Sequence, residues 1–216
     1  MLRAVKLITA ARHSSHKLDP VIVDLHPSRP EYRGFQTPLG LVSFQADPKF
    51  EEIEKAGGKV LKSDGSHTVL DDMFLVSGEI PRVTEYEKGL PRGMRFENGS
   101  WRSDTKMQDE RFLMCNLKDR GLVVFTGCGH AGVVNTVKHA VKIGDTRLWG
   151  IMGGFHLADA DAELMNASIA DLMALNPGIL LPGHCTGWRA KFLMEKEMPG
   201  KLAPSTVGTK FTFVGV

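Results

Sequence analysis

The segment GLVVFTGCGHAGVVNTV, residues 121–137, joins two kinds of secondary structure. Its first part is apolar and rich in Val, which predicts a buried strand, whereas the residues after Gly-Cys-Gly-His follow the spacing of a helix. A strand, a glycine-rich turn and a helix in this order are typical of α/β proteins, which bind ligands at the carboxyl ends of their strands. The turn is therefore a candidate binding site, and its ligand is either a phosphate group or a metal ion.

A phosphate is suggested by Gly127, Gly129 and Gly132, which fit the pattern G-x-G-x-x-G of dinucleotide-binding folds. Such folds also need an acidic residue at the end of the next strand, about 20 residues on, to bind the ribose. The corresponding segment here is RLWGIMGGFHL, which carries no carboxylate. The turn also contains His130, for which pyrophosphate binding has no use, so the dinucleotide alternative is the less favoured one.

A metal ion is suggested because the same ending recurs after two later strands. VVFTGCGH ends at His130, WGIMGGFH at His156 and ILLPGH at His184. Neighbouring parallel strands present their carboxyl ends at one edge of a sheet, and neutral imidazole is the commonest protein ligand for zinc. The sequence therefore predicts that His130, His156 and His184 bind a divalent metal ion, with zinc favoured and manganese or iron as alternatives. We expect His130 and His184 to belong to one set of ligands.

Two cysteines flank the candidate ligands. Cys128 and Cys185 could bind metal as thiolates or act as nucleophiles, although small buried side chains are the commoner role of free cysteines. His26 precedes Pro27 at the end of a strand and could also reach the site. A histidine in isolation is more often a structural residue than a ligand, so the repeated context of the three strand ends carries the metal prediction.

The composition narrows the class of protein. At 216 residues and 42% apolar, the chain is long enough for one domain, and its net charge of +2 is not gathered into a basic block. We therefore expect a small-molecule partner, and neither nucleic acid nor membrane. Three scattered cysteines favour a reducing compartment, so the cytoplasm is predicted. The basic opening MLRAVKLITAARHSSHK leaves the mitochondrial matrix as an alternative, but a helix with Leu2, Val5 and Ile8 on one face is favoured.

Strand and helix signals alternate along the chain and predict an α/β (α+β) fold with mixed sheets and helices on their outer faces. Helices are expected at residues 48–57, 131–143, 160–175 and 187–197, the first with Asp47 as its N-cap and Pro48 in its first position. Strands are expected at residues 20–25, 147–154 and 178–183, a meander at 59–86, a hairpin at 111–127 and a β-rich end at 210–216. Residues 88–108 are interpreted as a long functional loop.

Four segments in this order resemble the metallo-β-lactamase superfamily: FLVSGEIPRVTEYEKGLPRG, GLVVFTGCGHAGVVNTV, MGGFHL and LPGHCTGW. Within it they are similar to the branch of 7,8-dihydropterin-6-yl-methyl-4-(β-D-ribofuranosyl)aminobenzene-5′-phosphate synthase-like proteins. The resemblance implies an αββα sandwich with a metal site at one edge and mostly hydrolytic chemistry, in which a metal-bound water is the nucleophile. It also implies that His130 and His184 are ligands and that His156 lies on a loop bordering the site.

One signature of that superfamily, His-x-His-x-Asp-His, does not occur in the sequence, and the nearest text, RHSSHKLD, has the wrong spacing. We therefore interpret residues 1–216 as a single, N-terminally truncated domain, an incomplete sandwich that holds at most one ion and could self-associate through an uncovered sheet. Two functions remain: a metal-dependent hydrolase or synthase-like enzyme of doubtful activity, and a non-catalytic binding module. In the enzyme, Arg82, Arg92 and Arg95 would bind an anionic group of the substrate.

Overall fold

A computed structural model describes residues 1–215. The chain divides into two compact units, and each is described by itself. The first unit comprises residues 1–64 and 92–105, and the second comprises residues 65–91 and the described residues from 106 onward. All three strand-end histidines belong to the second unit, which therefore contains the candidate site.

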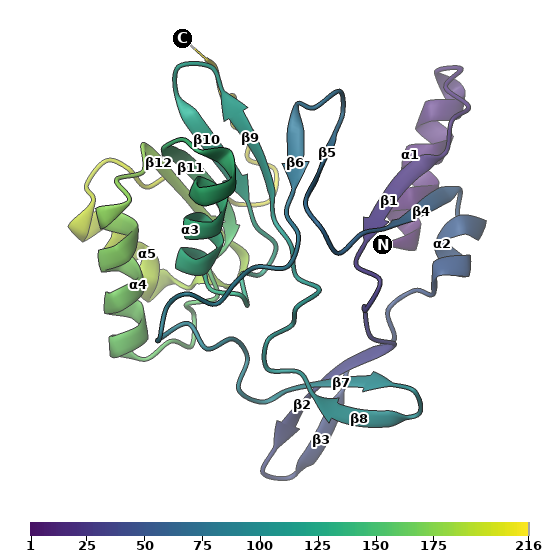
Figure 1. Cartoon of the computed structure of the whole chain (residues 1–216), viewed down its shortest axis with the longest axis horizontal. Coiled ribbons are helices and arrows are strands. Elements are labelled where there is room, and N and C mark those ends of the chain that lie inside the picture. Colours follow the sequence, from purple (N-terminus) through teal and green to yellow (C-terminus); the bar gives the residue numbers. More distant parts are fainter. Residues whose placement is uncertain (216) are drawn as a thin grey trace. The chain divides into compact units, whose positions relative to one another are not determined.

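Six strands form one mixed sheet in the second unit, in the order β12-β11-β10-β9-β6-β5 (Figure 1). Their bounds are β5 His67–Val69, β6 Phe74–Val76, β9 Leu113–Leu117, β10 Gly121–Phe125, β11 Leu148–Gly154 and β12 Ile179–Gly183. β10, β11 and β12 are parallel neighbours, whereas β9 is antiparallel to β10. The expected hairpin and the two later strands are confirmed, and the three parallel strands end at the same edge of the sheet.

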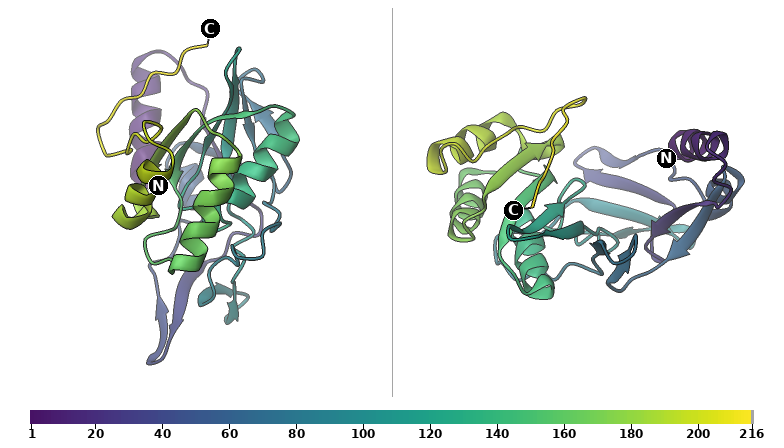
Figure 2. Two further views of the ribbon diagram at one scale, coloured as in Figure 1. Left: turned by 90° about the vertical axis from the view of Figure 1, so that its left-hand side faces the viewer. Right: turned by 90° about the horizontal axis from the view of Figure 1, so that it is seen from above.

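A helix follows each of these three parallel strands. α3 (Val133–Gly144) follows β10, α4 (Ala162–Ala174) follows β11, and the 3-10 turn η1 (His184–Thr186) and α5 (Trp188–Glu197) follow β12. α4 contacts both α3 and α5 and lies between them in both views of Figure 2. The Asp161 side chain caps α4 by accepting a hydrogen bond from the Leu164 N–H at 2.8 Å. The three expected helices are thus confirmed, with small shifts at their ends.

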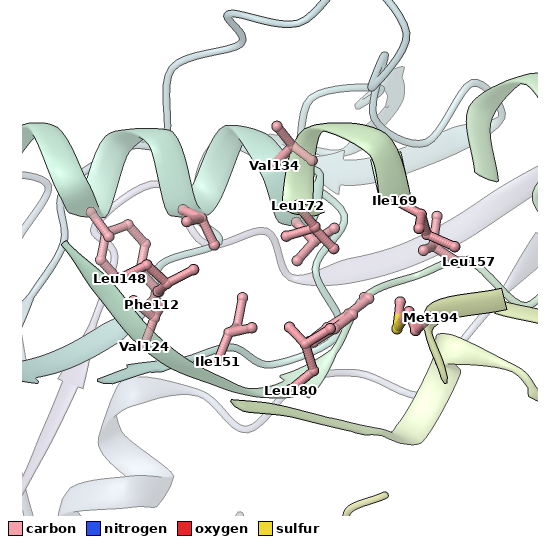
Figure 3. Packing of buried hydrophobic residues seen from close by; sticks show 14 of the residues in the cluster. Phe112, Val124, Val134, Leu148, Ile151, Leu157, Ile169, Leu172, Leu180 and Met194 are labelled. Carbon is pink, nitrogen blue, oxygen red and sulfur yellow. The ribbon is translucent and has the colours of Figure 1, made fainter. Parts of the chain in front are cut away.

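The main hydrophobic core lies between these helices and the sheet. Val134 of α3, Leu172 of α4, Ile151 of β11 and Leu180 of β12 belong to one buried cluster, and all four residues are 0% exposed (Figure 3). Burial of one such side chain contributes about 1.5–3 kcal/mol. The core therefore fixes each helix on the strands and, with it, the turn that carries each histidine.

The first unit contains two short sheets and two helices. Their bounds are α1 Leu2–Ser14, β1 Val21–Leu25, β2 Tyr32–Thr37, β3 Gly40–Ser43, α2 Phe50–Lys55, β4 Gly58–Lys62, β7 Gly93–Glu97 and β8 Ser100–Ser103. β1 pairs in parallel with β4, and the other sheet has the antiparallel order β3-β2-β7-β8. The expected amino-terminal helix is confirmed, but of its proposed apolar face Val5 is buried and Ile8 is 48% exposed.

The interpretation of residues 88–108 as one long loop is wrong. β7 and β8 lie within this range and pair antiparallel, with Phe96 opposite Trp101. The turn between them is Asn98-Gly99, whose φ angles of 52° and 77° are both positive. Asn-Gly between strands is the strongest short sequence signal for a hairpin, because both residues tolerate positive φ. The sequence carried this signal, but the arginines and glycines around it obscured the alternation of the strands.

Three other local expectations also need correction. β4 does not belong to a meander, because it pairs in parallel with β1, and residues 77–91 form neither helix nor strand. The N-cap of α2 is Lys49 rather than Asp47, and the Lys49 N–H donates to Glu52 Oε2 at 2.8 Å. Residues 210–215 form no strand, and Val216 lies outside the described residues. Of these, the pairing of β4 with β1 depends on a partner far away in sequence, which local sequence does not reveal, whereas the cap of α2 is local.

The helices are short, and the longest, α1 and α4, have 13 residues each. Within residues 1–215, none is both long and apolar enough to cross a bilayer.

Candidate metal centre

The three strand-end histidines are brought together with two cysteines. The ligand atoms of Cys128, His130 and His156 lie within 4.8 Å of one another, and so do those of Cys128, His184 and Cys185. The rings of His130 and His156 meet edge to face, with 4.6 Å between their centroids. These side chains therefore lie together at the sheet edge where β10, β11 and β12 end, which we call the rim. In the described part of the chain no such set contains both His130 and His184, and the two sets share Cys128 instead.

The backbone of the two later loops is unusual at the histidines themselves. His156 and His184 have φ angles of 51° and 47°, in the left-handed region that costs a residue other than glycine about 1–3 kcal/mol. Hydrogen bonds tie these loops together: the Phe155 N–H donates to Thr186 Oγ1 at 3.2 Å, and the Ala158 N–H donates to the Cys185 carbonyl at 3.1 Å. The surrounding structure thus holds both histidines in conformations that they would not adopt alone.

Gly129 allows the first loop to approach the second. Its φ is 81°, and a Cβ atom at this position would lie 2.5 Å from the carbonyl oxygen of Gly154. A contact this short with backbone cannot be relieved by rotating a side chain. Glycine is therefore required next to His130, where the loops after β10 and β11 meet.

Substitution of this glycine tests the close approach. We expect Gly129→Ala to destabilise the protein by at least about 1 kcal/mol more than Gly99→Ala, measured by urea denaturation. Both glycines have positive φ, but nothing lies within 4 Å of a Cβ at Gly99, so the control isolates the crowding. Equal losses for the two variants would show that the loops can move apart at no cost.

Glu110 is a residue of the site that sequence reasoning missed. Its Oε1 accepts hydrogen bonds from the N–H groups of Gly129 and His130, each at 3.0 Å, and from His130 Nδ1 at 3.1 Å. Its Oε2 accepts from the Ala131 N–H at 2.5 Å. A carboxylate can only accept, so Nδ1 of His130 carries a proton, and Nε2 is the ring nitrogen that remains for a metal. Glu110 precedes β9, so no local pattern pointed to it.

The same contacts determine the ionisation of this carboxyl. Burial alone would raise the pKa of Glu110, but the hydrogen bond and charge of His130 and the N–H groups of Ala131 and His130 outweigh it, so the pKa lies below its usual value. Burial, followed by the charge of His130, lowers the pKa of His156. Glu110 is therefore an anion and His156 a neutral imidazole near pH 7, the forms that suit a metal site.

Removal of the charge on Glu110 should weaken metal binding without deleting a ligand. We expect Glu110→Gln to lower zinc affinity by about 10–100-fold, the usual cost of losing a partner that orients a ligating histidine. A competition titration with a chromophoric chelator measures this affinity. Glu163→Gln is the matched control. Glu163 lines the adjacent pocket, and its substitution by Gln removes the same charge as Glu110→Gln does. If both variants lose affinity equally, the effect of Glu110 is general electrostatics rather than orientation of His130.

Cys128 and Cys185 are in direct contact. Both are free thiols, and their Sγ atoms are 2.9 Å apart, while Cys185 Sγ also lies 2.9 Å from the carbonyl oxygen of Cys128. Burial, followed by the hydrogen bond with Cys185, raises the pKa of Cys128 to about 12. The unliganded Cys128 thiol is therefore protonated near pH 7 and is a poor nucleophile, which argues against that alternative from the sequence.

A pocket of about 670 Å³ opens beside these ligands, lined by His130, His156, Cys185 and residues of the segment 85–91. Its described lining contains one Lys or Arg, Lys88, against five acidic residues, Glu85, Glu87, Asp159, Asp161 and Glu163. Glu87 accepts hydrogen bonds from the Val134 and Asn135 N–H groups and so covers the start of α3. The electrostatics of the pocket thus favour a cation, and an anionic molecule would need an additional positive charge.

The three arginines expected to bind an anionic substrate group lie in both units. Arg82 donates to the carbonyls of Ile80 and Lys106, whereas Arg92 and Arg95 belong to the first unit. Arg95 forms an ion pair with Glu97 at 2.8 Å. None of the three is among the described residues that line the pocket, and their role with substrate stays a prediction. His26 also lies in the first unit, where it is buried and its Nδ1 accepts from the Ser28 N–H.

Comparison with known proteins assigns the family. No protein-family model matches the sequence. The chain is 33% identical over 171 residues to the 7,8-dihydropterin-6-methyl-4-(β-D-ribofuranosyl)-aminobenzene-5′-phosphate synthase of Methanocaldococcus jannaschii, which covers 72% of this chain and 57% of that protein. The chain thus spans somewhat more than half the length of this curated relative.

A solved structure supports the fold. The crystal structure of a metal-dependent hydrolase of the β-lactamase superfamily superimposes with a TM-score of 0.74, covering 89% of this chain and 71% of that one at 22% identity. The mixed α/β architecture and the curated relative agree. The chain belongs to the metallo-β-lactamase superfamily, in the branch of the dihydropterin-ribofuranosylaminobenzene-phosphate synthase.

Proposed function

We propose that the chain is a metal-dependent protein of hydrolase or synthase-like type that binds one divalent ion through His130, His156 and His184, with zinc favoured over manganese and iron. The observation that carries the proposal is that the ends of three adjacent parallel strands supply two donor sets, one with His130 and His156 and one with His184, which share Cys128 beside a pocket of about 670 Å³. The names of the two similar proteins agree with a small-molecule substrate.

The residues present fit such an ion. Two overlapping sets of three donors lie within 4.8 Å, as ligands of one ion must. Glu110 fixes the ring of His130 with Nε2 available, and the buried Phe155 and Leu157 beside His156 exclude water from one side. When bound, the ion would supply Lewis acidity toward a polar bond of the substrate. The chain's own part is to orient ligands and to position the substrate in the pocket.

The charge of the pocket suggests an order of binding. An anionic substrate, the class we expect, would face mainly carboxylates in the described lining, and Lys88 alone does not balance them. A divalent cation at the histidines would add two positive charges within the same pocket. We therefore propose that the ion binds before an anionic substrate group and makes its binding favourable.

Calorimetric titration of the metal-free chain with zinc tests the proposal. The expected result is one ion per chain, and binding of a simple phosphate ester only after zinc has been added. A chain that binds no zinc, manganese or iron at all would overturn the metal-dependent function.

A second candidate function uses the same site. Since the sequence contains no His-x-His-x-Asp-His, a non-catalytic module that binds a metal or a small ligand without turnover remains our alternative. A loaded chain that binds ligand but shows no turnover on any substrate class would favour it. The cytoplasm or mitochondrial matrix, and self-association through an uncovered sheet, remain proposals that rest on the sequence.

A further inference from the structure

Cys128 and Cys185 lie among the candidate metal ligands, but a site of three histidines gives them no role. Cys128 is common to both sets of donors, and Cys185 completes the second set with His184. Each cysteine comes from a strand-end loop that also supplies a histidine, so each of these two loops offers one sulfur and one nitrogen donor. A centre built from histidines alone would leave without a role the one donor that both sets share, Cys128 Sγ.

We propose that Cys128 and Cys185 bind the ion directly as thiolates, so that the centre is a mixed sulfur and nitrogen site rather than a site of histidines only. The proposal rests on the metal binding of the proposed function and adds ligands to it. On binding, each Sγ forms a bond to the ion and its thiol proton passes to solvent.

The distances are compatible with a tetrahedral ion that takes both thiolates and two of the three histidines. Bonds of about 2.3 Å to sulfur and about 2.0–2.1 Å to nitrogen put two ligand atoms roughly 3.5–3.8 Å apart. Cys128 Sγ lies 3.5 Å from His156 Nδ1, which already fits. The 2.9 Å between the two Sγ atoms must widen by somewhat less than about 1 Å. Rotation of either side chain about its Cα–Cβ bond can supply a movement of this size.

The backbone leaves space for the sulfur atoms. A Cβ at Gly154 would lie 2.9 Å from Cys185 Sγ and 2.8 Å from the carbonyl oxygen of Cys128. Any side chain at this position would thus displace the thiol of Cys185 from the rim. The two thiols are also not joined, since a disulfide bond is about 2.05 Å long.

Thiolate ligands change the choice of ion. Sulfur donors favour zinc and other borderline or soft ions, whereas manganese, magnesium and calcium favour oxygen donors. We therefore expect the chain to bind zinc and cobalt(II) much more tightly than manganese, and this preference to depend on the two cysteines.

Cobalt(II) spectroscopy of the full, metal-free chain, kept reduced, tests the proposal. Cobalt bound by thiolate shows an intense near-ultraviolet charge-transfer band, and cobalt bound by imidazole shows only weak visible bands. We expect the strong band in the unchanged chain, a weaker one in Cys128→Ser and in Cys185→Ser, and none in the double variant. Cys115→Ser is the matched control, since Cys115 lies on β9 opposite Val123. The double variant should also bind zinc at least about 100-fold more weakly.

Alkylation keeps the test independent of the variants' folding. In the unchanged chain, zinc should protect Cys185 from iodoacetamide, read by mass spectrometry of peptides, and leave the reaction of Cys115 unchanged. Cobalt binding without the charge-transfer band, with Cys185 still reactive, would overturn the thiolate ligands and leave the proposed function standing. Absence of all metal binding would overturn both.

Discussion

The substitution His130→Ala is expected to lower zinc affinity by more than about 100-fold. Loss of an outer partner such as Glu110 typically costs about 10–100-fold, and this change removes the ligand as well as its oriented ring. In the proposed centre His130 would contribute Nε2, because its Nδ1 is held by Glu110 at 3.1 Å. Competition with a chromophoric chelator measures the affinity, and circular dichroism shows whether the variant is folded.

His67→Ala is the matched control for this change. His67 lies on β5, and its Nδ1 contacts the Gly65 carbonyl rather than the rim of the site. We expect its zinc affinity to equal that of the unchanged chain. If His130→Ala also kept its affinity, the ion would be held by Cys128, His184 and Cys185 without His130, and the ligand set proposed for the first strand end would be wrong.

The part of the fold that carries the site could be predicted from the sequence because its signals are local. Strand, turn and helix around His130, and again around His156 and His184, each follow from apolar runs, glycine and periodicity within about 20 residues. Parallel neighbours then share an edge, so the meeting of the histidines follows from topology. A glycine next to His130 that allows a sharp turn could also be anticipated from the sequence. The close approach of Gly129 to the carbonyl of Gly154 could not.

The remaining features depend on partners far apart in sequence. Glu110 contacts residues about 20 positions later, and no pattern links a carboxylate before one strand with the turn after the next. The sharing of Cys128 between two sets of donors depends on side-chain positions that the sequence leaves open. β4 and β1 pair across 37 positions, Val21 with Gly58, which is why a meander was expected instead. Local propensity is informative only where tertiary contacts agree with it.

The second large effect is expected in catalysis: the zinc-loaded 216-residue chain should be a poor hydrolase. We expect kcat/KM on generic phosphodiester, ester and lactam substrates at least about 100-fold below ~10⁴ M⁻¹ s⁻¹, the lower end of the usual range for enzymes. The reason is the small number of metal ligands that this chain offers. Hydrolases with two metal ions clamp the attacking and leaving oxygens between them. This sequence contains no His-x-His-x-Asp-His, and because its two donor sets share Cys128 we expect them to hold one ion.

Thiolate ligands would lower the activity further, because their negative charge reduces the Lewis acidity of the ion they hold. The assay compares the chain loaded with zinc, manganese or iron with the double variant His130→Ala, His184→Ala. Turnover at the usual efficiency that depends on metal and disappears in the double variant would show that one ion on this rim is sufficient, and the interpretation of the centre as incomplete would be wrong. Slow or absent turnover together with tight zinc binding is the expected result, since the rim then binds the ion without the second ion that fast hydrolysis needs.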